Sequence, residues 1–212
     1  GEELEGATIQ ILRKATEADA ADESTKYADE AKTLVIVEEW VSSDEAYEIK
    51  GLLTDTEYTL RETVAPEGYT ITTDTTFTID ETGKVTSTGT VSEDGVLLVE
   101  DAMTRIRVSK ADAASGEELE GATIQILRKA TEADTADKNT KYADEARTLV
   151  IVEEWVSEIE AHVIEGLLTN TEYILHETVA PDGYTITTDN TFTIDETGKV
   201  TSTGSVSEDG VL

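Results

Sequence analysis

The chain has 212 residues, enough for two domains of ordinary size, and its 47 acidic and 16 basic residues give a net charge of −31. This charge opposes binding to nucleic acid or to an anionic membrane surface, and it favours solubility. No apolar run approaches the length of a membrane span, and the absence of cysteine excludes disulfides and thiolate metal sites.

Residues 1–97 and 116–212 are two copies of one unit. They align without a gap and differ at 15 of 97 positions. A repeat of this length is a whole domain rather than a solenoid unit, so we predict two domains, 1–103 and 104–212. Because the connecting stretch occurs only once, we expect the first strand of domain 1 and the last strand of domain 2 to be missing from this sequence.

Several short strands are predicted along each unit. In the first copy they cover residues 7–12, 34–41, 46–50, 57–63, 75–79 and 84–90. Residues 14–32 are rich in Ala, Asp and Glu and are predicted to form a solvated insertion, with modest helical potential over 27–32. Asp80–Gly83 is predicted to be a hairpin turn rather than a calcium loop, because it lacks alternating ligands and a closing Glu. Short strands with regular turns favour a β-sandwich.

Charged residues occur on predicted apolar strand faces, because side chains alternate along a strand. The connecting stretch Leu98–Ala113 is predicted to contain the last strand of domain 1 and the first strand of domain 2. Asp101 shares a face of the former with Leu97, Val99 and Met103, and Lys110 shares a face of the latter with Ile106 and Val108. A buried lone charge is costly and normally loses its charge or finds a partner.

A third charged residue lies on the strand at 57–63, where Glu62 shares a face with Tyr58 and Leu60. In the second copy, Glu177 takes the same place beside Tyr173 and Leu175. From the residues alone, a buried ion pair or a side chain that reaches water is an alternative role for each charged group.

Three segments carry a family resemblance. They are VSKADAASGEELEGATIQIL at 108–127, GLLTDTEYTLRETVAPEGY at 51–69, and LLVEDA at 97–102. Together they resemble the Cna protein B-type repeat, which is also found in Gram-positive pilin subunits. The resemblance implies an all-β fold of two tandem transthyretin-like, or inverse immunoglobulin-type, β-sandwiches. It also implies a self-formed isopeptide bond between a first-strand Lys and a last-strand Asn or Asp, promoted by a Glu.

By this resemblance Lys110 matches the lysine, Asp101 matches the acceptor, and Glu62 and Glu177 match the promoting glutamates. Asp101 and Lys110 belong to different predicted domains, so we do not expect them to join within one chain. Their partners would then lie outside this sequence or on another molecule, which would supply a strand by complementation.

The chemistry implied by the resemblance has a clear physical requirement. A lysine in water has a pKa of ~10.4, so an amine nucleophile needs the lower value that burial in an apolar core produces. Burial also favours the protonated acid, and a neutral Glu can hydrogen-bond the acceptor and carry protons. Holding the amine and the acid in contact lowers the activation barrier by about 7–11 kcal/mol in favourable cases.

We therefore expect structural stalk repeats of an extracellular, cell-wall-attached adhesin or pilin of a Gram-positive organism. The expected partners are neighbouring repeats, with strand complementation by another copy as a further possibility, and no cofactor, metal, nucleic acid or membrane. The alternative is an adhesive module that binds a host protein or glycan, but no aromatic or apolar patch indicates one. A turnover enzyme is disfavoured, because the implied chemistry uses each residue once. His162 and His176 each occur in one copy only, so we do not expect either to be a metal ligand or a catalytic residue.

Overall fold

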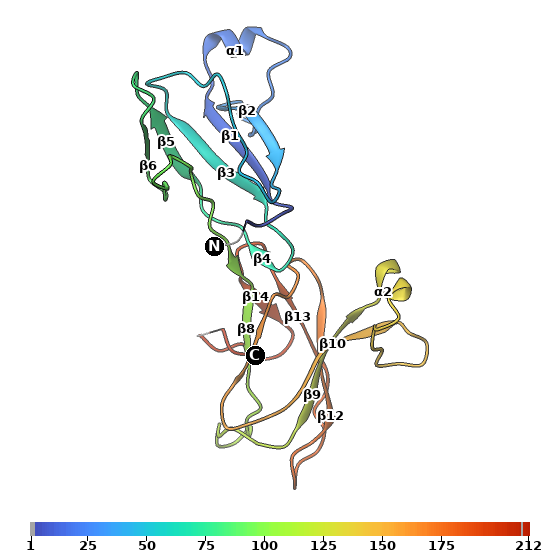
Figure 1. The fold of residues 1–212 in the computed structure, drawn as a ribbon. Helices are drawn as coiled ribbons and strands as arrows, with labels where there is room; N and C mark the ends of the chain where they lie inside the picture. The colour runs from blue at the N-terminus through green and yellow to red at the C-terminus, as the bar shows by residue number, and fades with distance from the viewer. Residues whose placement is uncertain (1–2, 209) are drawn as a thin grey trace. The chain divides into compact units, whose positions relative to one another are not determined.

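The structure is a computed structural model and describes residues 3–208 and 210–212. The chain divides into two compact units, Gly1–Ala102 and Met103–Leu212. Apart from two five-residue helices, α1 (Glu17–Ala21) and α2 (Glu132–Ala136), the regular elements of the described residues are strands (Figure 1). This confirms the predicted all-β class.

Unit 1 is built on an antiparallel sheet of five strands. In spatial order these are β2 (Leu34–Val41), β1 (Thr8–Lys14), β3 (Tyr58–Val64), β5 (Thr75–Ile79) and β6 (Val85–Ser87). A second pair joins β4 (Tyr69–Thr70) to β7 (Ala102–Met103). The turn between β5 and β6 contains Gly83 at φ 85°, where the missing Cβ removes the usual steric penalty.

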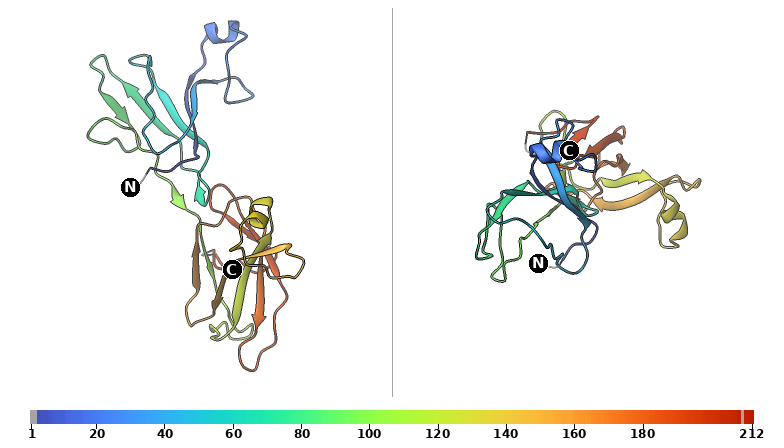
Figure 2. Two further views of the ribbon diagram at one scale, coloured as in Figure 1. Left: turned by 45° about the vertical axis from the view of Figure 1, so that its right-hand side comes forward. Right: turned by 90° about the horizontal axis from the view of Figure 1, so that it is seen from above.

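Unit 2 repeats the five-stranded sheet and adds a second one (Figure 2). The large sheet has the order β10 (Leu149–Val156), β9 (Thr123–Lys129), β12 (Tyr173–Val179), β13 (Asn190–Ile194) and β14 (Val200–Ser202). The small sheet pairs β11 (His162–Glu165) with β8 (Arg105–Val108). On the other edge of β8, Val211 forms a parallel bridge to Arg107.

The core of unit 2 lies between its two sheets. Ile106 and Val108 of β8 and Ile164 of β11 pack with side chains of the large sheet, which are Ile126, Tyr173, Phe192 and Ile194. Apolar faces from two layers therefore close over one core, which is the arrangement of a β-sandwich.

The core of unit 1 uses the same face of its large sheet. Buried residues there are Ala7, Ile9, Ile11, Tyr58, Leu60 and Phe77. Leu97 and Val99, from the stretch before β7, pack against this cluster as half-buried side chains. The period-2 pattern that predicted β3 is confirmed, because Tyr58, Leu60 and Glu62 are the buried members of that strand.

The modest helical potential noted over 27–32 does not become a helix, and the helix of the insertion lies at α1. It begins after Thr16, whose side chain and that of Asp19 form a reciprocal capping box. Asp29 instead accepts hydrogen bonds from the backbone N–H groups of Thr33 and Leu34, at 2.9 and 2.8 Å. A carboxylate that satisfies later amides in this way favours a turn over a helix.

The predicted strand over 46–50 forms in unit 2 as β11, but residues 46–50 of unit 1 have no regular structure. In unit 2 this strand is paired with β8. Among the described residues of unit 1, none occupies the place of β8, so the segment lacks a ladder partner.

The predicted continuous strand up to Met103 is also shorter than expected. Only β7 is regular there, together with an isolated bridge between Val91 and Leu97. Leu97 and Val99 do face the core, but Met103 is 52% exposed, so the predicted apolar face ends before it.

Buried tyrosine hydroxyls hold the loop before the central strand in both units. Tyr58 accepts a hydrogen bond from the backbone N–H of Leu53, and Tyr173 accepts one from Leu168, each at 2.8 Å. We predict that Tyr173→Phe destabilises unit 2 by about 1–2 kcal/mol, because a buried N–H loses its acceptor. Urea unfolding followed by Trp155 fluorescence in a Trp40→Phe background measures this loss.

The matched control is Tyr47→Phe, followed by Trp40 fluorescence in a Trp155→Phe background. The Tyr47 hydroxyl reaches Glu38 at the surface, and Tyr47 is 50% exposed. Surface substitutions of this kind change stability by less than about 0.5 kcal/mol. Equal losses in the two variants would contradict the role given to Tyr173.

Candidate functional site

Among the described residues, each large sheet carries one buried glutamate. Glu62 of β3 pairs in register with Ile9, and Glu177 of β12 pairs with Ile124. Both are buried, with exposed fractions of 4% and 5%. The predictions that these two residues point inward are therefore confirmed.

One oxygen of each glutamate is held by the backbone. The Oε2 atom of Glu62 accepts a hydrogen bond from the N–H of Thr72 at 2.8 Å. In unit 2, Oε2 of Glu177 accepts from the N–H of Thr187 at 2.7 Å and from its hydroxyl at 3.1 Å. The anchored oxygen fixes the carboxyl, and Oε1 is left for a second partner.

In unit 1 the neighbouring acid is Asp101, which acts on the pKa of Glu62. Burial, repulsion from the Asp101 carboxyl and a hydrogen bond between the two side chains raise the pKa of Glu62 from its ordinary value of 4.5 to about 7. Burial also raises the pKa of Asp101, against a lowering effect of its hydrogen bond with Glu62. Two neighbouring buried acids cannot both ionise easily, so the pair holds a proton more readily than either acid would in water.

In unit 2 the second partner is Lys110. Its Nζ atom lies 3.1 Å from Oε1 of Glu177, and the Lys110 side chain is only 13% exposed. Lys110 follows β8, whose Ile106 and Val108 are buried on the core side. The predicted inward direction of Lys110 is therefore confirmed, and its ammonium is compensated by a buried carboxylate.

The two units thus differ in the residue beside equivalent glutamates, and the two neighbours are an acid and an amine. The glutamate contacts an acid in unit 1 and an amine in unit 2. Asp101 lies in unit 1 and Lys110 lies in unit 2. Among the described residues, Glu62 and Asp101 form no ion pair with a Lys or Arg, and Glu177 has no aspartate against it.

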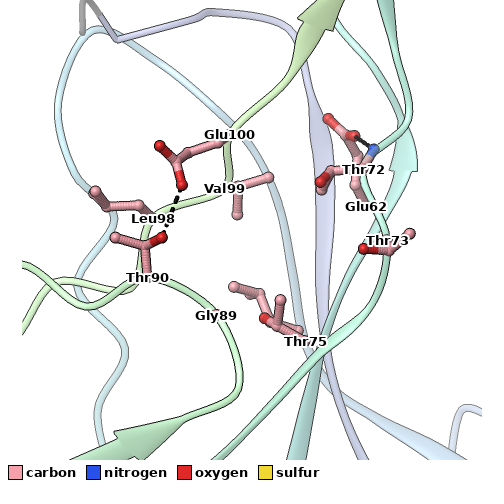
Figure 3. A pocket seen from close by; sticks show the side chains of 10 residues that line it. Glu62, Thr72, Thr73, Thr75, Gly89, Thr90, Leu98, Val99 and Glu100 are labelled. Carbon is pink, nitrogen blue, oxygen red and sulfur yellow. Dashed lines mark hydrogen bonds between the residues drawn. The ribbon is translucent and has the colours of Figure 1, made fainter.

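A cavity of about 100 Å³ adjoins Glu62 in unit 1 (Figure 3). In Figure 3, Glu62 and Thr72 form one wall, joined by their hydrogen bond, and Val99 and Glu100 stand on the opposite wall. The remaining lining residues are Leu60, Thr73, Thr75, Gly89, Thr90 and Leu98. A Cβ atom on Gly89 would come within 2.8 Å of Thr75 Cγ2, so a larger residue there would force the Thr75 side chain to shift.

The two histidines form separate paired contacts instead of a common site, and the tryptophans pack against the two cores. His162 Nε2 lies 2.7 Å from Glu153, and His176 Nδ1 lies 2.7 Å from Asp189. Trp155 stacks on His162, with ring centroids 4.5 Å apart. Within the part of the chain that the structure describes, no group of three or more His, Asp or Glu side chains is placed to hold a metal ion. The two described helices are also too short to span a bilayer.

The family model described as "SpaA: Prealbumin-like fold domain" matches residues 1–93 and again residues 104–207. The chain belongs to this family. Prealbumin is another name for transthyretin, so the match confirms the predicted transthyretin-like fold and the resemblance to pilin repeats. The two matches correspond to two copies of one domain.

Solved structures from Lactobacillus rhamnosus GG are also similar to the chain. The C-terminal fragment of the pilus adhesin SpaC is 17% identical, with 92% of this chain and 76% of that chain covered and a TM-score of 0.36. The shaft pilin SpaA is 18% identical, with 91% and 84% covered and a TM-score of 0.31. These identities and scores are low, so family membership rests on the family model.

The chain spans a quarter of the length of the longer SpaC pilus adhesin chain, which it matches at 17% identity over 92% of its own length with a TM-score of 0.35. No curated protein matches the sequence.

The backbone anchors at Thr72 and Thr187 were not predicted from the sequence. Each lies ten residues beyond its glutamate, in a segment without regular structure. The contact common to both units is the backbone N–H, to which Thr187 adds its hydroxyl. Any residue type except proline carries a backbone N–H, so residue identity gave no signal for the common contact.

The acid pair predicts a pH dependence for the stability of unit 1. Glu62 binds its proton more tightly in the folded unit than in the unfolded chain, so folding takes up a proton between its ordinary pKa of 4.5 and about 7. The contribution is fully present below this window and is lost as the pH rises through about 7. Urea unfolding of the Trp155→Phe chain, followed by Trp40 fluorescence at a series of pH values, measures it.

The control for this prediction is Glu62→Gln, which removes the titrating group and keeps its size. Its stability should depend much less on pH across the same window. A parent chain whose unit 1 grows more stable as the pH rises through this window would contradict the assignment of the raised pKa.

Proposed function

We propose that the chain consists of structural stalk repeats of a surface adhesin or pilin, each stabilised by a self-formed Lys–Asp amide bond. The supporting observation is the pair of half-sites, in which equivalent buried glutamates contact Asp101 in one copy and Lys110 in the other. The two copies differ at only 15 of 97 positions, so the contact seen in one copy is expected in the other. Combined, the two contacts give one complete site with an amine, a glutamate and an aspartate.

In the proposed reaction the Nζ atom of the lysine attacks the Cγ atom of the aspartic acid. The new bond is the amide C–N bond, the bond that breaks is C–O, and one water molecule leaves. The glutamate takes one proton from the ammonium and returns it to the departing hydroxyl, then takes a second proton from the nitrogen of the adduct and ends protonated, so nothing is oxidised or reduced. Conversion of charged groups into a neutral amide also removes the cost of burying them.

The glutamate is suited to this role by its two unequal oxygens. Oε2 accepts a backbone hydrogen bond in both units, so the exchangeable proton belongs on Oε1. In unit 1 the pKa of Glu62, about 7, favours proton exchange near neutral pH. Oε1 of Glu177 is the atom 3.1 Å from the Lys110 ammonium.

A stalk role fits the properties of the chain. The bond would tie the first strand of a unit to its last strand and resist separation of its ends. The chain has no cysteine, so an amide would supply the cross-link that disulfides provide in other exported proteins. The net charge of −31 favours an extended spacer whose neighbouring copies repel one another. An extracellular, wall-attached location is part of this proposal.

Intact mass tests the cross-link. Leu212 lies beside β8, since its N–H donates to Arg107 and its carbonyl accepts from Ser109. A chain extended after Leu212 by the sequence of Leu98–Thr104 therefore continues toward Lys110 and carries the equivalent of Asp101. We predict that the extended chain is lighter than its sequence mass by one water molecule, and that tandem mass spectrometry finds Lys110 in the linked peptide.

Two variants of the extended chain serve as controls. Lys110→Arg keeps the positive charge but should show the full sequence mass, and Glu177→Gln should abolish or greatly slow the loss. The cross-linked unit should exceed the Lys110→Arg variant in stability by up to about 4.7 kcal/mol, the chain-entropy value for closing a loop of ~100 residues. A folded extended chain with unmodified mass would refute the proposed bond.

A separate proposal is that another copy of the chain supplies the missing strand. The chain of 212 residues tests it. If Asp101 of one molecule joins Lys110 of another, incubation should give a covalent ladder on a denaturing gel, and Lys110→Arg should remove it. A single monomer band would support supply of the strand within one polypeptide.

A further inference from the structure

One edge of each large sheet is only partly covered. In unit 1 the edge strand is β2, which lies at one end of the strand order (Figure 1). Residues 26–28 of the insertion cover its first part, where the N–H of Ile36 donates to the carbonyl of Lys26 at 2.9 Å. Among the described residues, no other strand or loop forms a backbone bond along the outer side of residues 37–41. This stretch is therefore open to pairing with a further strand.

The backbone of the open stretch presents its groups alternately to β1 and to the open side. The N–H of Ser42 donates to the carbonyl of Ala7 at 2.8 Å, which is on the β1 side. Because neighbouring residues of a strand direct their backbone groups to opposite sides, Val41 and Glu39 present theirs to the open side. An antiparallel strand beside them can exchange two hydrogen bonds with each of these residues.

The open stretch carries negative charge on both faces of the sheet. Trp40 packs against the core, so Glu39 lies on the outer face and Glu38 on the core side. Glu39 accepts a hydrogen bond from the side-chain amide of Gln10, and Glu38 accepts one from a tyrosine hydroxyl. Both donors are neutral, and among the described residues no Lys or Arg forms an ion pair with either glutamate. A second acidic edge would be repelled here, so charge favours a cationic strand.

Exposed valines beside the edge supply an apolar contact. Val41 pairs in register with Thr8, and Thr8 pairs on its other side with Val64, so the three residues form one row across the sheet. Val41 is 62% exposed and Val64 is 53% exposed. Charged side chains are a usual protection of a free edge. An apolar row adds nothing to such protection, but it offers contact area to a side chain from an added strand.

Unit 2 repeats this edge. The sequence VEEWV occurs at 37–41 and again at 152–156. The N–H of Ile151 donates to the carbonyl of Lys141, so the insertion covers the first part of β10 in the same way. In the equivalent row, Val156 and Val179 are 57% and 53% exposed. The open acidic edge is therefore a property of the repeated domain.

We propose that the open edges of β2 and β10 bind an extended cationic segment of another protein as an added antiparallel strand. The segment carries an apolar residue opposite Val41. Because the strands run antiparallel, Lys or Arg residues two and three positions later then lie opposite Glu39 and Glu38. Main-chain hydrogen bonds provide the affinity of such a complex, and alternate side chains provide its specificity. This interaction surface lies at the edge of the sheet and does not depend on the amide bond proposed for the core.

An NMR titration of the 212-residue chain with the peptide acetyl-TVTKKVT-amide tests the proposal. The backbone N–H resonances of Glu39 and Val41, and those of Glu154 and Val156, should shift and saturate. Half-saturation is expected on the order of 0.1–1 mM, because the interface is far smaller than that of a stable complex. Raising the salt concentration from about 50 to about 500 mM should weaken binding, because salt screens charges at a surface.

Three control peptides distinguish strand addition from simple attraction of charge. The acidic peptide acetyl-TVTEEVT-amide should produce no saturable shift. N-methylation of the second and fourth residues of the cationic peptide should abolish binding, because their N–H groups face the edge. N-methylation of the third and fifth residues, whose N–H groups face solvent, should retain it. An equal response to the acidic peptide, or equal binding of the two methylated peptides, would overturn the proposal.

The two edges within one molecule provide a matched control. Glu39→Lys should weaken binding at unit 1 by about fivefold or more, because an attractive cross-strand pair becomes a repulsive one. In the same sample, the resonances of Glu154 and Val156 should shift as in the parent chain. Glu154→Lys should give the reverse pattern, and it decides the question if Glu39→Lys fails to fold. The absence of a saturable shift at these edge residues, or a shift that neither substitution reduces, would overturn the proposal.

Discussion

Burial of one carboxyl group in the middle of each large sheet is the constraint on which the rest of the site depends. Glu62 and Glu177 lie on the core faces of β3 and β12, among buried apolar side chains that exclude water. A carboxyl in such a place must be protonated or compensated. Unit 1 meets this demand with a more tightly held proton and unit 2 meets it with an ammonium, and both use the same backbone anchor for the second oxygen.

The two copies act as a natural comparison of which contacts the fold requires. At the surface, the link of Arg61 to Asp74 becomes a link of His176 to Asp189, so the contact is kept while its chemistry changes. The ring that stacks on the tryptophan changes from Tyr47 to His162 and still reaches the equivalent glutamate. The core face and the buried glutamate do not vary between the copies. Replacement is therefore tolerated where solvent can share the interaction.

Family membership and the physical properties of the chain are consistent with the structural role that we propose. The same prealbumin-like domain is matched twice, so one domain is repeated. The acidic composition favours solubility, and the antiparallel sheet gives each domain a continuous hydrogen-bonded layer. A reaction inside the core would then stabilise the module rather than turn over a substrate, because each participating side chain could react only once.

The sequence by itself determined the all-β class, the repeat, and the inward direction of Glu62, Glu177 and Lys110, because strand alternation is a local rule with a period of two residues. Only the tertiary structure decided which charges meet. It paired Glu62 with Asp101 and Lys110 with Glu177, it left residues 46–50 without a ladder partner, and it supplied backbone donors at Thr72 and Thr187. These outcomes depend on which distant segments pack together, and side-chain pattern along one strand carries no information about that.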